Sequence, residues 1–483
     1  MRSKQTRKRR MLKRKMEEAL LRWKNTHDHN PLVIMGIRQC GKTFTVQQFA
    51  KRNYSNVVYI NFALEQDKYI AFTGNKDVEN ILTNLSSIMP EAKFIPGRTC
   101  LIFDEIQECP DARTALKSFK IDGRFDVIAT GSLLGVRGYG EKQKKEQNQQ
   151  LGKNSIPVGY ETIVEMYPLD FEEFLWANGI SEKIIDVLHD CFLNESPVPA
   201  GVHYSMMQLL YRYIVVGGLP AVVNTFLETK HFGQVAASSK AIITEYEEDM
   251  VKYADDQNKS NIRECFESIP KQLAKENKKF QYSIIKKGAR ASQYLGSLQW
   301  LEDAGIIKRC YNTSITELPL EGNAMADCFK VYVTDIGLLL AMLDAGTRAD
   351  VIQGNLLGYK GAIFENLMAD FLHKRGQNLY YFHKDSGLEL DFLIRHRGEC
   401  TPLEVKAKSG KSKSLSTVLN NPKHYHVNHA IKLGNYNIGR EGPLLTVPLY
   451  MGFFIDFEDD ADIQLEDLDI EAINSLLKEF LQG

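Results

Sequence analysis

The sequence predicts a multidomain α/β protein, and three features support this. The chain has 483 residues, more than one typical core organises, so three or four units are expected. In the N-terminal third, short apolar runs alternate with helical stretches, the pattern of a doubly wound parallel sheet. Further strand-like segments with hairpin-length connections return in residues 379–451, which indicates a second, separate α/β unit.

Composition and charge narrow the class of protein. No apolar run approaches the ~20 residues that span a bilayer, so we expect a soluble protein without membrane association. The start of the chain lacks a signal-peptide pattern, and the eight cysteines form no C-x-x-C pair, which favours a reducing cytoplasm. The net charge of −1 conceals a basic N-terminal arm and an acidic tail. DNA is therefore a candidate partner of the arm, although charge runs are more often solvated surface.

The first α/β unit is predicted from four apolar runs. "PLVIMG" reads as a strand that leads through a loop into a helix, and "VVYINF", "TCLIFD" and "FDVIATGS" follow at intervals wide enough for helices. The glycine-rich, charged stretch 135–154 has no apolar period and is expected to be a loop at a strand end. The unit is expected to span residues 31–170.

The rest of the chain divides by pattern into further units. "VVGGLPAVV" interrupts a helical stretch, since Gly-Gly and Leu-Pro demand a turn between helices. Three later helices end in a β-ribbon, which suggests a winged helix that binds DNA or protein. The expected units are a basic N-terminal helix (1–30), the α/β domain (31–170), a helical connector (171–260), a winged-helix-like domain (261–335), a terminal α/β domain (336–455) and an acidic tail (456–483).

The stretch "GIRQCGKT" predicts a phosphate-binding loop. It matches G-x-x-x-x-G-K-[ST], follows an apolar strand and opens a helix. Its glycines let backbone N–H groups turn toward phosphate oxygens, Lys42 reaches the β/γ-phosphates, and the Thr43 hydroxyl can bind Mg²⁺. ATP with Mg²⁺ is the expected ligand. The predicted nucleotide-binding residues are Gly36, Ile37, Arg38, Gln39, Cys40, Gly41, Lys42 and Thr43, together with Asp104.

Hydrolysis, and not binding alone, is predicted from the two later strand ends. A carboxylate at the end of a neighbouring strand is needed on the metal side, and Asp104 can hold Mg²⁺ through water while Glu105 acts as the general base. A helix-capping Asp-Glu pair is the alternative. Thr130 and Ser132 are candidates to orient the water or to sense the γ-phosphate, and either could simply cap a turn. Arg137, in the loop that follows, is a weak candidate for an arginine finger, so we expect a homo-oligomer to supply the finger in trans.

Two C-terminal strands carry acids among apolar residues. Strict alternation would place Glu389 and Asp391 on one face of a strand, opposite Leu388, Leu390 and Phe392. In "PLEVKA", Glu404 and Lys406 share a face in the same way. An ordinary half-buried sheet with a polar outer side would give this pattern, and so would a metal site.

The motifs in order resemble a known family. "GIRQCGKT", "CLIFDEIQECPDA", "IATGSLLG" and "YPLDFEEFL" resemble AAA+ type ATPases with a C-terminal DUF4143 domain. "VGGLPAVV", "KVYVTDIGLL", "GAIFENLMADFL" and "ELDFLI" with "PLEVKAKSG" continue the resemblance over nearly the whole chain. It implies an AAA-like core, a winged helix and a terminal domain of the restriction-endonuclease-like, PD-(D/E)XK type. Cys40 replaces an aliphatic residue of the family pattern, a small change that leaves the loop intact.

The resemblance assigns the terminal acids to a possible nuclease site. Such folds use an acid on a helix, then an Asp and an E-x-K motif on strands, which here would be Glu365, Asp391 and Glu404-Val405-Lys406. Asp391 and Glu404 could share a divalent ion and Lys406 could position water. Two functions follow: ATP turnover coupled to DNA binding or Mg²⁺-dependent DNA cleavage, or an ATP-dependent regulatory switch whose nuclease-like domain is inactive.

Overall fold

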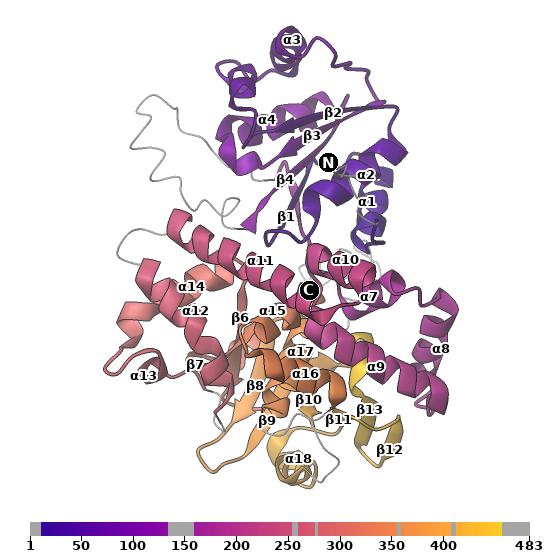
Figure 1. Ribbon diagram of the computed structural model, residues 1–483, viewed down its shortest axis with the longest axis vertical. Coiled ribbons are helices and arrows are strands. Elements are labelled where there is room, and N and C mark those ends of the chain that lie inside the picture. Colours follow the sequence, from indigo (N-terminus) through magenta and orange to yellow (C-terminus); the bar gives the residue numbers. More distant parts are fainter. Residues whose placement is uncertain are drawn as a thin grey trace, which may run out of the picture.

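The computed structural model describes residues 11–133, 159–253, 259–275, 279–354, 359–406 and 412–455 (Figure 1). Arg137 and the acidic tail 456–483 lie outside these ranges. Within the described ranges no helix is both long and apolar enough to cross a membrane.

The first unit is a parallel sheet covered by helices. Its five strands within the described ranges lie in the order β2-β3-β4-β1-β5, and every pairing is parallel. The elements are α1 (Met16–Asn25), β1 (Leu32–Gly36), α2 (Lys42–Asn53), β2 (Asn56–Asn61), η1 (Gln66–Phe72), α3 (Val78–Ile88), β3 (Thr99–Asp104), η2 (Ile106–Glu108), α4 (Pro110–Asp122), β4 (Asp126–Ser132) and β5 (Thr162–Glu165). All six residues of β3 are buried, as expected for a strand covered on both faces.

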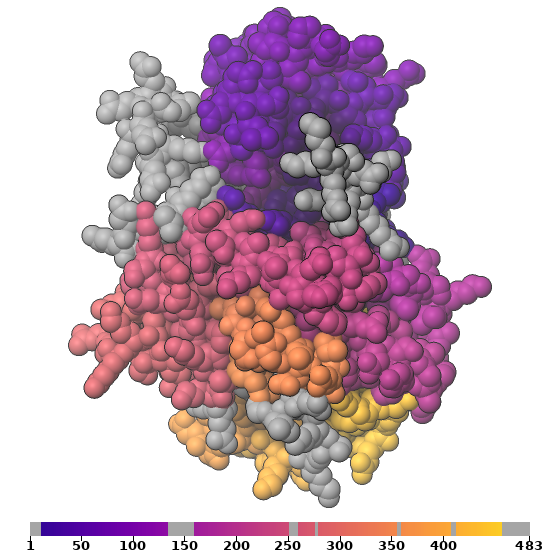
Figure 2. Space-filling view, viewed as in Figure 1, coloured from indigo at the N-terminus to yellow at the C-terminus, as the bar shows by residue number. Residues whose placement is uncertain are grey.

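A layer of helices follows the sheet. Its elements are α7 (Phe171–Ala177), α8 (Glu182–Leu193), α9 (Ala200–Val216), α10 (Pro220–Thr229) and α11 (Phe232–Tyr253). In Figure 1, α10 and α11 lie between the N-terminal sheet and the orange sheet below it, and Figure 2 shows the indigo domain resting on this pink layer. The turn before α10 needs glycine, because a Cβ on Gly218 would lie 2.0 Å from the Leu169 carbonyl oxygen.

The C-terminal half forms a mixed sheet. Among the described residues its eight strands run in the order β12-β13-β11-β10-β9-β8-β6-β7. The elements are α12 (Lys259–Leu273), α13 (Tyr282–Ile285), α14 (Ala291–Asp303), β6 (Ile307–Thr313), η3 (Glu321–Asn323), β7 (Ala324–Val333), α15 (Ile336–Ala341), α16 (Ala345–Gln353), α17 (Lys360–Lys374), β8 (Leu379–His383), β9 (Glu389–His396), β10 (Glu399–Val405), α18 (Lys413–Leu419), α19 (Pro422–Tyr425), β11 (Ala430–Gly434), β12 (Gly439–Glu441), β13 (Leu444–Pro448) and η4 (Leu449–Phe454).

The β-ribbon expected to be the wing of a separate domain is part of this larger sheet. Three helices do precede the antiparallel hairpin β6–β7. However, β6 also pairs in parallel with β8, through Cys310 opposite Leu379. The hairpin therefore does not stand free, and the unit boundary expected after residue 335 is bridged by backbone hydrogen bonds.

Strand β9 departs from the strict alternation expected from its sequence. Tyr380 pairs with Leu393 and Phe382 with Leu390, so β9 carries one residue more than β8 in this stretch. The bulge sends Leu390 and Phe392 to different core clusters, although they are two residues apart. It lies next to Asp391, and such bulges commonly redirect a side chain.

One hydrophobic core extends through all three layers. It includes Ile34 and Ile128 of the N-terminal sheet, Ile214 of α9, and Leu403 of the terminal sheet. A second core covers the far face of the N-terminal sheet, and a third lies beneath α18. The units predicted as separate domains are thus packed on a shared core, so a change at one sheet has a physical route to the other.

Candidate nucleotide site and terminal acid cluster

The phosphate-binding loop connects β1 to α2 as the motif predicts. Gly36 allows close packing, because a Cβ there would lie 2.2 Å from the Met166 carbonyl oxygen, and Gly41 has φ +99°, which favours glycine. Lys42 is buried, and its Nζ donates to the carbonyls of Gly36 at 2.9 Å and Ile37 at 3.0 Å. The backbone carbonyls of the loop thus hold the ammonium group of Lys42.

Asp104 accepts hydrogen bonds from three other strands or helices. The Thr43 hydroxyl lies 2.9 Å from its Oδ1, the Tyr59 hydroxyl 2.6 Å and the Asn61 amide 3.0 Å from its Oδ2. Thr130 also donates to Oδ1. Burial, followed by the hydrogen bond to Asp104, raises the pKa of Tyr59, so this phenol stays protonated as a donor. The two predicted metal-side residues, Thr43 and Asp104, are therefore adjacent.

Two details of the sequence prediction need correction here. Asp104 lies on β3, and β4 separates this strand from β1, so it is not on an immediately neighbouring strand. Thr130 on β4 is fully buried and bonds to Asp104, so its hydroxyl orients that carboxylate and does not face the pocket. Ser132, at the end of the same strand, does line the pocket.

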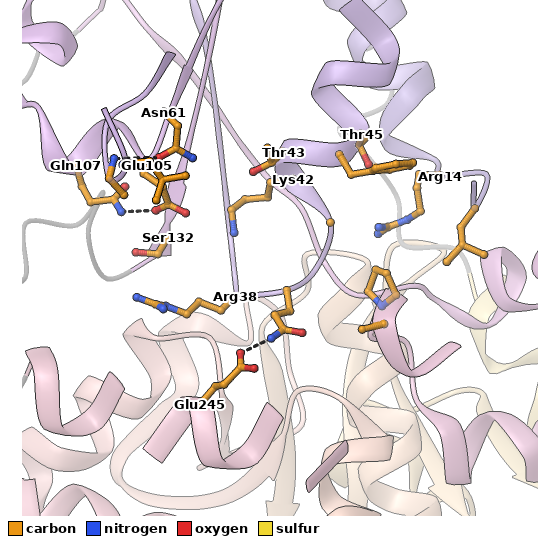
Figure 3. Close-up of a pocket in the computed structure, with 18 of the residues that line it drawn as sticks. Arg14, Arg38, Lys42, Thr43, Thr45, Asn61, Glu105, Gln107, Ser132 and Glu245 are labelled. Atoms are coloured by element: carbon orange, nitrogen blue, oxygen red, sulfur yellow. Dashed lines mark hydrogen bonds between the residues drawn. The ribbon is translucent and has the colours of Figure 1, made fainter. Parts of the chain in front are cut away.

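A cavity of about 670 Å³ opens beside the loop. Figure 3 shows Glu105, Gln107 and Ser132 at one end, Thr45 and Arg14 at the other, and Lys42 with Thr43 between them. The helical layer closes part of it, since Pro220, Ala221 and Asn224 of α10 and Glu245 of α11 line the wall. The cavity is therefore built from two units of the chain, and the sequence motif revealed only one of them.

Glu105 is available at the pocket for proton transfer. It follows β3 with a left-handed backbone, φ 54°, and lines the cavity. The Gln107 amide donates to its Oε2 at 2.5 Å, which fixes the direction of the carboxylate (Figure 3). A carboxylate directed into the cavity next to Ser132 is where a base for an attacking water would lie.

Arg14 is a site residue that the sequence interpretation missed. Its guanidinium is buried and donates to the carbonyls of Cys40, at 2.8 Å, and Tyr167, at 2.6 Å, and to the Glu173 carboxylate at 3.1 Å. It braces the phosphate loop against the start of α7. The residue was hidden in a basic run that resembled a nucleic-acid arm. In the described part of that run, Lys13 pairs with Glu182 and Lys15 with Asp170, so these charges serve internal ion pairs.

Helix α11 contacts the phosphate loop directly. The Gln39 amide donates to Glu245, as the dashed line in Figure 3 shows. Arg38 forms an ion pair with Asp249 at 2.5 Å, and the Tyr246 hydroxyl donates to the Arg38 carbonyl at 3.1 Å. The side chains of Arg38 and Gln39 are therefore both held by acids of the helical layer.

Comparison with protein families assigns the first unit. An AAA domain family model matches residues 28–175. This segment is similar to AAA domains of the P-loop ATPase type. Families described as domains of unknown function match residues 207–349 (DUF8612) and 360–450 (DUF4143). No curated protein matched the chain. The AAA domain thus contains the phosphate loop, Asp104 and Glu105, whereas α10 and α11 belong to the segment that follows it.

Solved structures resemble the chain only weakly. The Walker-type ATPase PABY2304 of Pyrococcus abyssi has 14% identity and a TM-score of 0.39, with 69% of this chain and 96% of that chain covered. AMPPCP-bound DnaA from Aquifex aeolicus has 14% identity and a TM-score of 0.25, covering 60% and 86%. A Pif1 helicase from Bacteroides has 14% identity and a TM-score of 0.23, covering 43% and 50%. Scores this low carry no argument about function.

The terminal acids do converge, on α17, β9 and β10. Glu404 is 3% exposed, and its Oε1 accepts from the Ser412 hydroxyl at 2.9 Å and pairs with Lys406. Its Oε2 is buried without a hydrogen-bond partner among the described residues. Asp391 accepts from the Val405 N–H at 2.8 Å, just beyond the last β9–β10 pair. The surface-charge alternative does not describe a carboxylate buried to this degree.

Electrostatics couple these groups. Burial, then the neighbouring carboxylates of Glu365 and Glu404, raises the pKa of Asp391 well above its usual range. Burial alone would lower the pKa of Lys330, but Glu365, Glu389 and Asp391 outweigh it and the pKa is raised. The Lys330 ammonium lies 2.5 Å from Glu389 and is 1% exposed. Lys330, on β7, was not predicted from sequence because β8 and β6 separate its strand from β9.

These acids fit a divalent ion only in part. Within the ranges that the structure describes, no group of three or more His, Cys, Asp or Glu side chains is arranged to hold a metal ion. Glu365 accepts from the Tyr332 hydroxyl at 3.3 Å. The unpartnered oxygen of Glu404 and the carboxylates that surround Asp391 suit a cation, so Asp391 and Glu404 remain the candidate ligands, and the role of Glu365 stays a prediction.

A cluster of buried polar groups joins the end of the first unit, the helical layer and the C-terminal half of the chain. We call it the junction cluster, and its members are Leu169, Tyr213, Gly218, Asp335, Asp370 and Lys374. The Lys374 ammonium lies 2.8 Å from Asp370, 3.4 Å from Asp335 and 3.1 Å from the Leu169 carbonyl oxygen. Asp335 accepts from the Gly218 N–H at 2.7 Å. Burial raises the pKa of Asp370 to about 7, with Lys374 opposing the shift. Gly218 belongs to the "GGLP" motif and Asp335 to the "TDIG" motif, so both motifs meet α17 at this cluster.

Proposed function

We propose that the AAA domain binds ATP with Mg²⁺ and hydrolyses it, and that turnover acts on the helical layer. The supporting observation is the cavity that the phosphate loop, Glu105 and α10–α11 line together. The loop N–H groups and the start of α2 would bind the phosphates, with Lys42 turning from its backbone carbonyls to the β/γ-phosphates. Bound Mg²⁺ would neutralise phosphate charge, and Thr43 and Asp104 would hold it. Glu105 would accept the proton of the attacking water.

Nucleotide binding tests this proposal through Lys42. We expect Lys42→Ala to weaken the binding of ATP by at least about 100-fold, because a buried ammonium facing phosphate is lost. Isothermal titration of the full-length protein with ATP and Mg²⁺ measures this. Lys51→Ala, at an exposed position of the same helix, is the matched control and should bind normally. Equal affinity in wild type and Lys42→Ala would refute the assignment, provided that circular dichroism shows both variants folded.

The terminal domain supports a second candidate function, Mg²⁺-dependent cleavage of DNA. The observation in its favour is the buried Glu404, with one unpartnered oxygen, beside Lys406 and Asp391. Asp391 and Glu404 would hold the ion, which supplies charge neutralisation at the phosphodiester. Lys406 would orient water or stabilise the developing charge. The alternative is a regulatory switch in which this domain binds DNA or protein without cutting.

Plasmid nicking separates these alternatives. If the terminal site cleaves DNA, Asp391→Ala and Glu404→Ala should each abolish nicking in Mg²⁺ or Mn²⁺ and leave ATP hydrolysis near normal, because neither residue lines the cavity beside the phosphate loop. Glu399→Ala, on the same strand as Glu404, is the control and should retain cleavage. Wild-type protein that nicks no DNA with either metal, with or without ATP, would leave the switch as the function.

A further inference from the structure

The contacts between α11 and the phosphate loop have no role in the chemistry described above. They involve Gln39 with Glu245, Arg38 with Asp249, and the Tyr246 hydroxyl with the Arg38 carbonyl; we call these the α11 contacts. Glu245, Tyr246 and Asp249 recur at one-turn spacing and so lie on one face of the helix. That face is directed at the loop that receives the phosphates.

Charge makes these contacts sensitive to nucleotide. Arg38, Gln39 and Glu245 all line the cavity (Figure 3). A guanidinium pairs with phosphate as readily as with carboxylate, so bound phosphate competes with Asp249 for Arg38. Phosphate and the Glu245 carboxylate carry the same sign of charge, so they repel one another across the cavity. The phosphates of the nucleotide and the two acids of α11 therefore compete for the side chains of Arg38 and Gln39.

Helix α11 also has the position needed to transmit such a change. It packs on α10, which lines the cavity, and on α12 and α15 of the following segment. Asp335 of the junction cluster directly precedes α15, and its carboxylate caps the helix by accepting from the Leu338 N–H at 3.2 Å. A displacement of α11 would reach both the helices before the β6–β7 hairpin and the contact with α17.

We propose that the α11 contacts form a nucleotide-sensitive latch: Glu245 and Asp249 hold the phosphate loop when the site is empty, and the phosphates of ATP displace them and release α11. This regulation rests on the proposed ATP binding. Displacement of the two acids costs free energy, and by linkage this cost lowers the affinity of the protein for ATP. Weakening the latch should therefore tighten nucleotide binding, which is opposite to the effect expected of an ordinary binding-site substitution.

The test uses Glu245→Gln in the full-length protein, with Tyr246→Phe as a second variant that removes only the hydroxyl bonded to Arg38. Titration with ATP and Mg²⁺ should show affinity about tenfold tighter for Glu245→Gln, since one like charge is removed. Glu248→Gln, an exposed carboxylate of the same helix, is the charge-matched control and should bind as wild type does. Tyr246→Phe should shift the affinity in the same direction by a smaller factor.

Hydrogen exchange gives a readout that a merely structural role would not change. ATP should increase amide exchange in α11 of the wild type, and Glu245→Gln should show part of that increase without nucleotide. Unchanged or slower exchange in α11 on ATP binding, or weaker binding by Glu245→Gln, would overturn the latch. If the wild type binds no ATP at all, the proposed function fails instead, so the two failures are distinguishable.

Discussion

Replacing Lys374 with alanine is expected to lower the free energy of unfolding by about 3–5 kcal/mol, because it leaves buried carboxylates of the junction cluster without their cation. The side chains of Lys374, Asp335 and Asp370 are 1% exposed or less, so water cannot compensate for the lost charge. Urea unfolding followed by circular dichroism measures the effect. The cluster joins three segments, so the loss should appear in the main cooperative transition.

Two further variants separate an unpaired charge from lost packing. Lys374→Met combined with Asp370→Leu removes the lysine and the nearer of its two carboxylates, while Asp335 keeps the Gly218 and Leu338 N–H donors. This variant should lose less stability than Lys374→Ala, since replacing a buried ion pair by apolar groups is often nearly neutral. Lys423→Ala, at an exposed position, should change stability by no more than about 0.5 kcal/mol. If Lys374→Ala matched the Lys423→Ala control, the junction cluster would have no energetic role.

Glu105→Gln is expected to reduce ATP turnover by about 10²–10⁴-fold while leaving ATP binding intact, because the amide cannot accept the proton of the attacking water. Gln107 can still hydrogen-bond the substituted side chain, so the geometry of the strand end should persist. Steady-state phosphate release and a parallel binding titration measure the two effects. Glu91→Gln, an exposed residue of the AAA domain, is the control. Turnover by Glu105→Gln near the wild-type rate would remove Glu105 from the role of base.

The phosphate loop could be predicted because its determinants are contiguous. The eight residues Gly36–Thr43 carry the backbone requirement, the lysine and the hydroxyl, and the apolar strand before them sets the context. Asp104 and Glu105 were also correctly expected at a strand end. What the sequence could not supply was strand order, and only that order explains why Thr130 faces Asp104 and not the pocket.

Other features depend on contacts between distant residues. Arg14 reaches Cys40, Tyr167 and Glu173, and nothing in a run of lysines and arginines distinguishes the one that becomes buried. Strand β9 looked regular, because a bulge of one residue leaves no clear mark in an alternating pattern. The β6–β7 hairpin resembled a free wing, since its pairing with β8 is made nearly 70 residues later along the chain (Cys310 to Leu379). The roles of the terminal acids stay predictions.

Phosphate release from ATP by the purified full-length protein tests the central claim most directly. With Mg²⁺, the wild type should release phosphate continuously, Glu105→Gln should bind ATP without releasing it, and Lys42→Ala should do neither. Chelation of the metal with EDTA should stop release by the wild type. Release at the same rate by the wild type and Lys42→Ala, at equal concentrations of folded protein, would contradict the account, because hydrolysis would then occur without the phosphate loop.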